Sequence, residues 1–164
     1  MRGKVNKVRQ LVFLSLVVGT ALYGGDVSIF NVPGPVANCL TPLAGQFKID
    51  GRINPFYLRG DFDGDGRTDY AVLITNSKGE RGVAICRAAA RAPEIVGAGF
   101  VLNRSADFDF DAWMVFLKGP VEKGVGEGPP PRLLGEAISI IWSESASALL
   151  YWDGRKFRWY QQGD

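Results

Sequence analysis

The chain has 164 residues, with nineteen basic and seventeen acidic side chains and no histidine. Without histidine, a Ser-His-Asp triad and every zinc site that uses imidazole are excluded. The near balance of charge, with no basic patch that carries interleaved aromatic residues, gives no reason to expect a nucleic-acid partner.

Residues 1–21 have the order of a secretory signal peptide. Four basic residues come first, an apolar run follows from Leu11 to Val18, and Gly19-Thr20-Ala21 supplies the small residues of a cleavage site. The apolar run is much shorter than the roughly 18 residues that a membrane-spanning helix needs. Cleavage leaves fifteen basic and seventeen acidic residues, a net charge of −2. We therefore expect a periplasmic or secreted protein, or a membrane-tethered one if this segment stays uncleaved.

Residues 26–164 are numerous enough to form a single β-rich domain with its own core. Their apolar residues follow the spacing of strands, and Gly and Pro interrupt nearly every gap. Strands are predicted at Phe56–Arg59, Tyr70–Thr75, Gly82–Arg87, Phe108–Leu117, Ala137–Ser143, Ser147–Trp152 and Lys156–Gln161, with a hairpin turn at residues 153–156. A short helix is predicted at Pro35–Leu40 and a single turn at Ala88–Ala92. The predicted fold class is mainly β, an antiparallel sheet of hairpins like one propeller blade, with one or two short helices.

Cys39 and Cys86 are the only cysteines of the chain. Two cysteines in an exported domain favour one disulfide. Such a bond would stabilise the fold by about 4 kcal/mol in the chain-entropy view. The alternative is a pair of buried free thiols, because Cys86 lies within a predicted strand.

Residues 61–69 read Asp-Phe-Asp-Gly-Asp-Gly-Arg-Thr-Asp, and their spacing predicts a calcium site. Carboxylates at alternate positions would repel one another without a cation between them, and calcium accepts six to eight oxygen ligands in irregular geometry. The predicted ligands are the side chains of Asp61, Asp63, Asp65 and Asp69 and the backbone carbonyl of Arg67. Gly64 and Gly66 allow the chain to curl around the ion, because glycine enters positive φ without steric cost.

This loop differs from an EF-hand, because its twelfth position is Val72 and a predicted strand follows it. Residues 55–88 resemble the FG-GAP or VCBS-like repeat, the calcium-binding unit of integrin-type β-propellers and of many secreted bacterial proteins. Only one copy is present, and about 164 residues cannot hold the roughly four to eight blades of a propeller. The chain also resembles small uncharacterised exported bacterial proteins that carry one such loop.

A second acidic stretch, Asp107-Phe108-Asp109-Phe110-Asp111, has the same alternation but no glycine. Alternation in a strand places the two phenylalanines on one face and Asp107, Asp109 and Asp111 on the other. The stretch is predicted to be a half-buried strand with a solvated acidic edge. The alternative is a second cation site.

Two further segments have a structural and a functional interpretation. Five aromatic residues between Tyr151 and Tyr160 form either cross-strand core pairs or a face for a sugar or peptide. Residues 119–135 hold five glycines and four prolines, which predicts a long loop. This loop is either a disordered or variable insertion or a docking segment for a partner.

Two functions remain. The first is an exported, calcium-stabilised binding or structural module that contacts an unknown protein or glycan ligand of the cell envelope, and it is not an enzyme. The second is a small carboxylate-dependent glycan hydrolase with structural calcium, for which Glu94, Glu136 and Glu144 are candidates by residue type. Contact with a membrane is expected only through an uncleaved N-terminal segment, and the sequence does not specify an oligomeric state.

Overall fold

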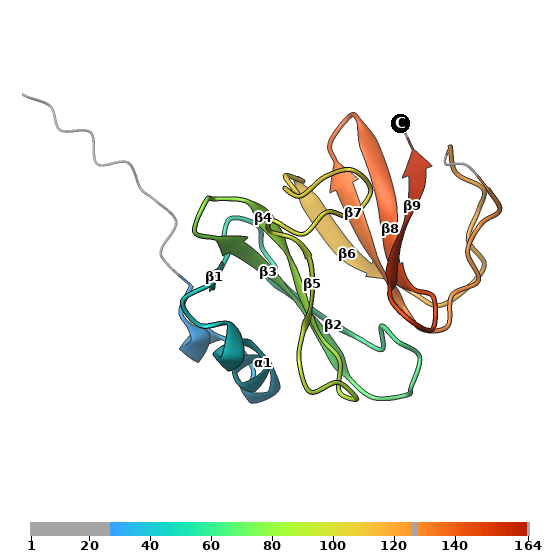
Figure 1. Cartoon of the computed structure of the whole chain (residues 1–164). Coiled ribbons are helices and arrows are strands. Elements are labelled where there is room, and N and C mark those ends of the chain that lie inside the picture. The colour runs from blue at the N-terminus through green and yellow to red at the C-terminus, as the bar shows by residue number, and fades with distance from the viewer. Residues whose placement is uncertain (1–26, 126–127, 164) are drawn as a thin grey trace, which may run out of the picture.

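The computed structural model describes residues 27–125 and 128–163, so the predicted signal peptide lies outside the described residues. The described chain forms nine strands in two antiparallel sheets, one short α-helix and two 3-10 turns (Figure 1). The mainly β prediction is confirmed. None of the described helices has both the length and the apolar character needed to cross a bilayer.

The first sheet is built around β3, which pairs with β1, β2 and β4. Its strands are β1 (Phe47–Ile49), β2 (Tyr57–Gly60), β3 (Asp69–Asn76), β4 (Arg81–Cys86) and β5 (Glu94–Gly97). The order is β1-β3-β4-β5, and β2 also pairs with β3. Phe47 lies opposite Asn76, and Tyr57 lies opposite Val72. Strands β1 and β2 therefore share one edge of β3.

The second sheet is a meander of neighbouring strands. These are β6 (Ala112–Phe116), β7 (Ala137–Trp142), β8 (Ala146–Trp152) and β9 (Phe157–Gly163), in the order β6-β7-β8-β9. The predicted turn at residues 153–156 joins β8 to β9, and Trp152 pairs with Phe157 across it. The predicted C-terminal hairpin is thus confirmed.

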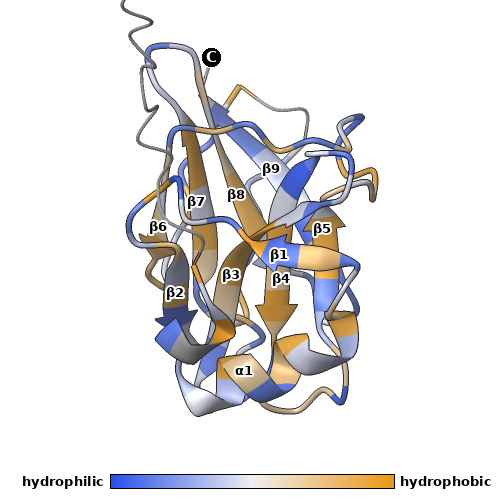
Figure 2. Cartoon of the chain, turned by 90° about the vertical axis from the view of Figure 1, so that its left-hand side faces the viewer, coloured by the Kyte–Doolittle hydropathy of each residue, from blue (hydrophilic) through white to orange (hydrophobic). Residues whose placement is uncertain are grey.

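The main core lies between the two sheets. It combines Leu73, Val83 and Ile85 of the first sheet with Ile138 and other apolar residues of the second. Figure 2 shows apolar residues along much of β4, β7 and β8. Since each sheet buries one face against the other, neither sheet would be stable alone in water.

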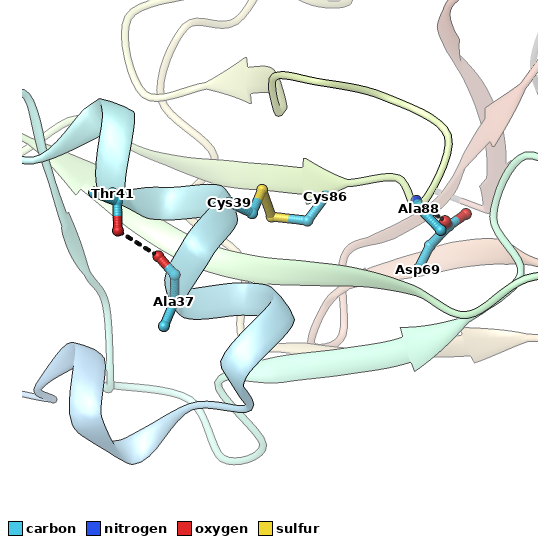
Figure 3. The surroundings of a disulfide bond; sticks show 6 residues. All are labelled: Ala37, Cys39, Thr41, Asp69, Cys86 and Ala88. Atoms are coloured by element: carbon cyan, nitrogen blue, oxygen red, sulfur yellow. Dashed lines mark hydrogen bonds between the residues drawn. A yellow bond between two sulfur atoms is a disulfide. The ribbon is translucent and has the colours of Figure 1, made fainter.

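The outer face of the first sheet is covered by helix α1 (Gly34–Leu40), which lies between the 3-10 turns η1 (Ile29–Asn31) and η2 (Thr41–Leu43). Pro35 occupies the first turn of α1, where its missing N–H costs no hydrogen bond. Cys39 of the helix is bonded to Cys86 of β4, with Cα atoms 5.9 Å apart (Figure 3). The disulfide is therefore confirmed over the free-thiol alternative.

The Gly/Pro-rich segment covers the outer face of the second sheet. Val121 and Leu133 are buried there against Leu149 and Tyr160. The Tyr160 hydroxyl also accepts a hydrogen bond from the backbone amide of Gly124 at 3.0 Å. The segment is a loop, as predicted, and Val121 and Leu133 attach it to the sheet, while most of its other described residues are exposed.

One predicted strand differs from the structure, and two short strands were missed. The acidic stretch at 107–111 precedes β6 instead of forming its first half, because its backbone bonds to Arg81 and Ile141 outside any regular ladder. Phe108 and Phe110 nevertheless point into the core, as the alternation predicted. The predicted single turn is present within residues 88–92, and the short strands β1 and β5 were not predicted.

Candidate metal centre

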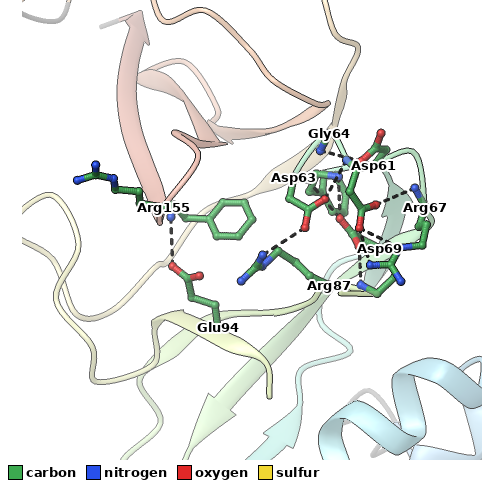
Figure 4. A network of polar contacts seen from close by, with 12 residues as sticks. Asp61, Asp63, Gly64, Arg67, Asp69, Arg87, Glu94 and Arg155 are labelled. Carbon is green, nitrogen blue, oxygen red and sulfur yellow. Dashed lines mark hydrogen bonds and ion pairs between the residues drawn. The ribbon is translucent and has the colours of Figure 1, made fainter. Parts of the chain in front are cut away.

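The acidic loop joins β2 to β3 and gathers three carboxylates. One carboxylate oxygen each from Asp61, Asp63 and Asp65 lies within 4.8 Å of the other two (Figure 4). No other group of three acidic or cysteine side chains in residues 27–125 and 128–163 is placed to hold a metal ion. A cluster in which every ligand atom is an oxygen suits a hard cation.

The aspartates also fold the loop. Asp61 accepts hydrogen bonds from the backbone amides of Gly64 at 2.8 Å and Gly66 at 3.0 Å. Both glycines have positive φ, 80° and 83°. Asp63 accepts from the amide of Asp65 at 3.2 Å, so each turn of the loop is held by the aspartate that precedes it.

The loop is fastened to the segment that enters the second sheet. Glu136 accepts a hydrogen bond from the Asp61 amide at 2.8 Å and donates its own amide to the Asp61 carbonyl at 2.7 Å. A Cβ added to Gly64 would lie 2.4 Å from the carbonyl oxygen of Leu134, so only glycine fits there. Glu136, predicted as a catalytic candidate, therefore anchors the loop to residues beside β7.

Asp69 is not one of the three carboxylates that lie within 4.8 Å of one another, although it contacts the same loop. It is 0% exposed, and its carboxylate accepts hydrogen bonds from the amides of Ala88 at 2.7 Å, Phe62 at 3.0 Å and Asp63 at 3.3 Å. Burial raises the pKa of Asp69, and the bond from Ala88 opposes that rise. The side chain predicted to close the metal site thus holds the loop backbone to the residues that follow β4.

Two arginines lie beside the carboxylates. Arg67 donates to Asp65 through Nε at 2.9 Å and Nη2 at 2.7 Å, and these hydrogen bonds lower the pKa of Asp65. This contact involves the Arg67 side chain, while its carbonyl as a ligand stays a prediction. Arg87 donates to Asp63 at 3.2 Å, and its guanidinium lies 4.0 Å from the centre of the Trp152 ring.

Arg87 therefore connects the loop to β8, a contact that no sequence pattern indicated. Its Nε is buried without a hydrogen-bond partner among the described atoms, so electrostatic attraction and stacking hold it in place. Together the four aspartates of the loop and the two arginines leave a net charge of −2, and Glu136 adds a further negative charge. The formal charge of the centre as a whole is therefore negative.

Two carboxylates of the second acidic stretch form ion pairs with arginine side chains. Arg81 binds Asp107 through Nη2 at 2.6 Å and also contacts Asp109, and Arg52 binds Asp109 at 2.8 Å. Asp111 instead accepts a hydrogen bond from the amide of Ser143 at 2.7 Å. The alternative of a second cation site therefore finds no support in the described residues.

The other two catalytic candidates lie on separate elements. Glu94 of β5 accepts a hydrogen bond from the amide of Phe157 at 3.1 Å, and Figure 4 places it away from the acidic loop. Glu144 is exposed in the turn between β7 and β8, with a φ of 58°. Neither contacts Glu136 through a hydrogen bond.

Comparison of the chain with protein-family models, curated proteins and solved structures found no match. The resemblance to the FG-GAP repeat therefore rests on the loop residues themselves. The geometry shows three clustered carboxylates in a loop that contacts both sheets, and this arrangement fits a hard divalent cation.

Proposed function

We propose that this chain is an exported calcium-binding β module that acts as a binding or structural protein of the bacterial envelope. The observation that carries the proposal is the cluster of Asp61, Asp63 and Asp65, with one carboxylate oxygen from each within 4.8 Å of the others. The basic, apolar and small residues of segment 1–21 support export.

The donor set favours calcium over other biological metals. Zinc sites use histidine and cysteine, but the chain has no histidine and both cysteines are in the disulfide. Magnesium demands near-ideal octahedral geometry, whereas calcium accepts an irregular set of carboxylate and carbonyl oxygens. A calcium concentration in the millimolar range, as outside cells, suffices for a weak site.

The position of the loop supports a stabilising role for the cation. Asp61 is bonded to Glu136 beside β7, and Asp63 is bonded to Arg87, which stacks on Trp152 of β8. Neutralising the carboxylates would remove their mutual repulsion and hold these contacts in place. A ligand at a hundred times its dissociation constant stabilises the folded state by about 2.7 kcal/mol. For a domain of this size we expect a rise in Tm on the order of 5–10 °C.

Thermal unfolding with calcium, with magnesium and with a chelator tests the proposal. We expect Tm to rise with calcium and to fall with chelator, and Asp65→Ala to abolish the difference. Asp65 suits the test because it is exposed and bonded only within its own loop, so its loss leaves the core intact. Asp109→Asn is the matched control, because it removes an aspartate of the other acidic stretch and should keep the calcium shift.

An identical Tm of the wild-type protein in calcium and in chelator would refute the calcium proposal. Export is tested separately by the N-terminal sequence of the protein recovered from bacterial culture. A mature terminus near residue 22 in the periplasm or medium is expected, and cytoplasmic recovery with an intact Met1 would contradict it. The described residues do not favour the glycan hydrolase alternative, because Glu94 and Glu136 each accept a backbone amide at separate places.

A further inference from the structure

A second candidate binding site lies at the end of the sandwich where β7 turns into β8. It is a pocket of about 310 Å³ between the segment that follows β5 and the second sheet. Its lining includes Asn103, Ser105, Trp142, Ser145, Trp159 and Gln161. None of these residues belongs to the acidic loop.

Two turns form the rim of this pocket. Leu102 and Ser105 exchange backbone hydrogen bonds of 2.9 and 3.1 Å, and the two residues between them, Asn103 and Arg104, have φ values of 49° and 67°. Positive φ at both central residues is the geometry of a tight two-residue turn, and this turn places Asn103 at the pocket. The opposite rim is the turn at 143–145, and in Figure 1 the yellow segment before β6 lies beside β7.

Two indole rings line the pocket. The rings of Trp142 and Trp159 have centroids 5.7 Å apart and an interplanar angle of 55°. Trp159 packs on Phe108 and Trp142 packs on Phe110, so the core fixes both orientations. Both indoles remain half-buried and reach the pocket. The Trp159 N–H is bonded to Gln161, while that of Trp142 has no partner in the described part of the chain.

The polar groups of the pocket are almost entirely neutral. The only charged lining residue is Asp107, and Arg81 donates to both of its carboxylate oxygens, at 2.8 and 2.6 Å. No lysine or arginine lines the pocket, so a phosphate or another anion would find no counter-charge. The amide of Asn103 and the hydroxyl of Ser145 equally disfavour an alkyl chain, which would offer them no hydrogen-bond partner.

We propose that this pocket binds a neutral saccharide unit of a glycan. A pyranose ring combines an apolar C–H face, which packs on indole, with hydroxyls that donate and accept hydrogen bonds. Trp142 and Trp159 supply the apolar surface, and the amide of Asn103 and the hydroxyl of Ser145 supply the polar partners. The volume is near the lower end of the range of about 300–1,000 Å³ for ligand pockets, which suits a short saccharide unit.

This inference rests on the proposed binding role and assigns that role a ligand class and a place. It does not depend on the cation, because the pocket and the acidic loop share no residue. A weak affinity is expected, because few groups surround a small ligand in a pocket of this size.

The test is an array of neutral oligosaccharides that includes chitotriose and cellotriose, followed by tryptophan fluorescence titration of each sugar that binds. We expect saturable binding that Ser145→Tyr weakens by at least tenfold, because the new ring would fill the pocket. Ser143→Tyr is the matched control, because Ser143 is exposed in the same turn but does not line the pocket. Trp142→Phe keeps a ring but removes the free N–H, and it should weaken binding less than Ser145→Tyr.

Each outcome decides between the proposals. Absence of binding to every neutral glycan, or equal binding by the Ser145→Tyr and wild-type proteins, would overturn the saccharide site. Binding of unstructured peptides in place of sugars would overturn the ligand class. Each titration is repeated with calcium and with chelator. A calcium-dependent Tm without sugar binding refutes this inference alone, and sugar binding without a calcium shift refutes the calcium proposal alone.

Discussion

Asp69→Ala should destabilise the protein more than any substitution of the three clustered aspartates. Asp69 is the only polar or charged residue that the described part of the chain buries fully, and its carboxylate accepts three backbone amides. Two of these bonds, at 2.7 and 3.0 Å, have good geometry, while the bond at 3.3 Å is long. Alanine would leave these amides without an acceptor beneath the loop.

The magnitude follows from the two good bonds. An unsatisfied donor costs about 1–3 kcal/mol, so the buried Phe62 amide at about 3 kcal/mol and the partly buried Ala88 amide at about 1 kcal/mol together cost about 4 kcal/mol. Removing a buried carboxylate also removes its desolvation penalty, which offsets about 1 kcal/mol of that loss. We expect the free energy of unfolding to fall by about 3 kcal/mol, which moves the midpoint of urea unfolding by about 1.5 M at a slope near 2 kcal/mol/M.

The assay is urea unfolding followed by tryptophan fluorescence, in chelator and again in calcium. Asp65→Ala is the comparison, because its exposed carboxylate bonds only to Arg67 and solvent screens such a pair, so its loss should change the stability little without a cation. If Asp69 acted only as a calcium ligand, the two variants would be equally stable in chelator and would differ from the wild type only in calcium. That result would refute a structural role for the Asp69 carboxylate.

Two further predictions concern the loop and its surroundings. Gly64→Ala should cost about 3 kcal/mol or more, because its Cβ would meet the Leu134 carbonyl at 2.4 Å, whereas Gly66→Ala meets nothing within 4 Å and should cost about 1 kcal/mol for its positive φ. Equal thermal shifts would show that the loop does not pack on residue 134. Arg81 lowers the pKa of Asp107 to about 2 through hydrogen bonds, so this pair should stabilise the fold above about pH 4 and lose that effect as the pH falls through about 2. Acid unfolding should therefore be less steep over that range in Asp107→Asn, and superimposable profiles would contradict the prediction.

Strong local patterns in the sequence predicted the centre of the fold. The apolar run of β3 and the turn at residues 153–156 are encoded by neighbouring residues, and both were placed correctly. The strands β1 and β5 were missed because each has only three or four residues, too few for a periodic pattern to stand out from the surrounding chain. They form because β3 and β4 offer unpaired backbone edges, and an edge is a property of the assembled sheet.

The candidate metal site was likewise predicted only where its residues are neighbours in the sequence. Spacing alone placed Asp61, Asp63 and Asp65 together, since they belong to one short loop. The partners that fix this loop lie 24 residues away at Arg87 and 75 residues away at Glu136, and no local pattern indicates such contacts. The spacing of the aspartates also could not show that Asp69 would be buried, because its burial depends on other parts of the chain that pack over the start of β3.

Helix α1 and the Gly/Pro-rich segment cover the two outer sheet faces and oppose the stacking of further sheets on this domain. Architectures of stacked sheets extend because each sheet leaves a free apolar face for the next one. In this protein α1 is held on one outer face by the disulfide, and the segment around Gly124 is held on the other through Tyr160. A third sheet from another copy would have to displace a bonded element and expose buried side chains such as Val36 or Val121. The two elements therefore act as end caps, and they leave the strand edges and the turns as the surfaces through which copies of this chain can meet.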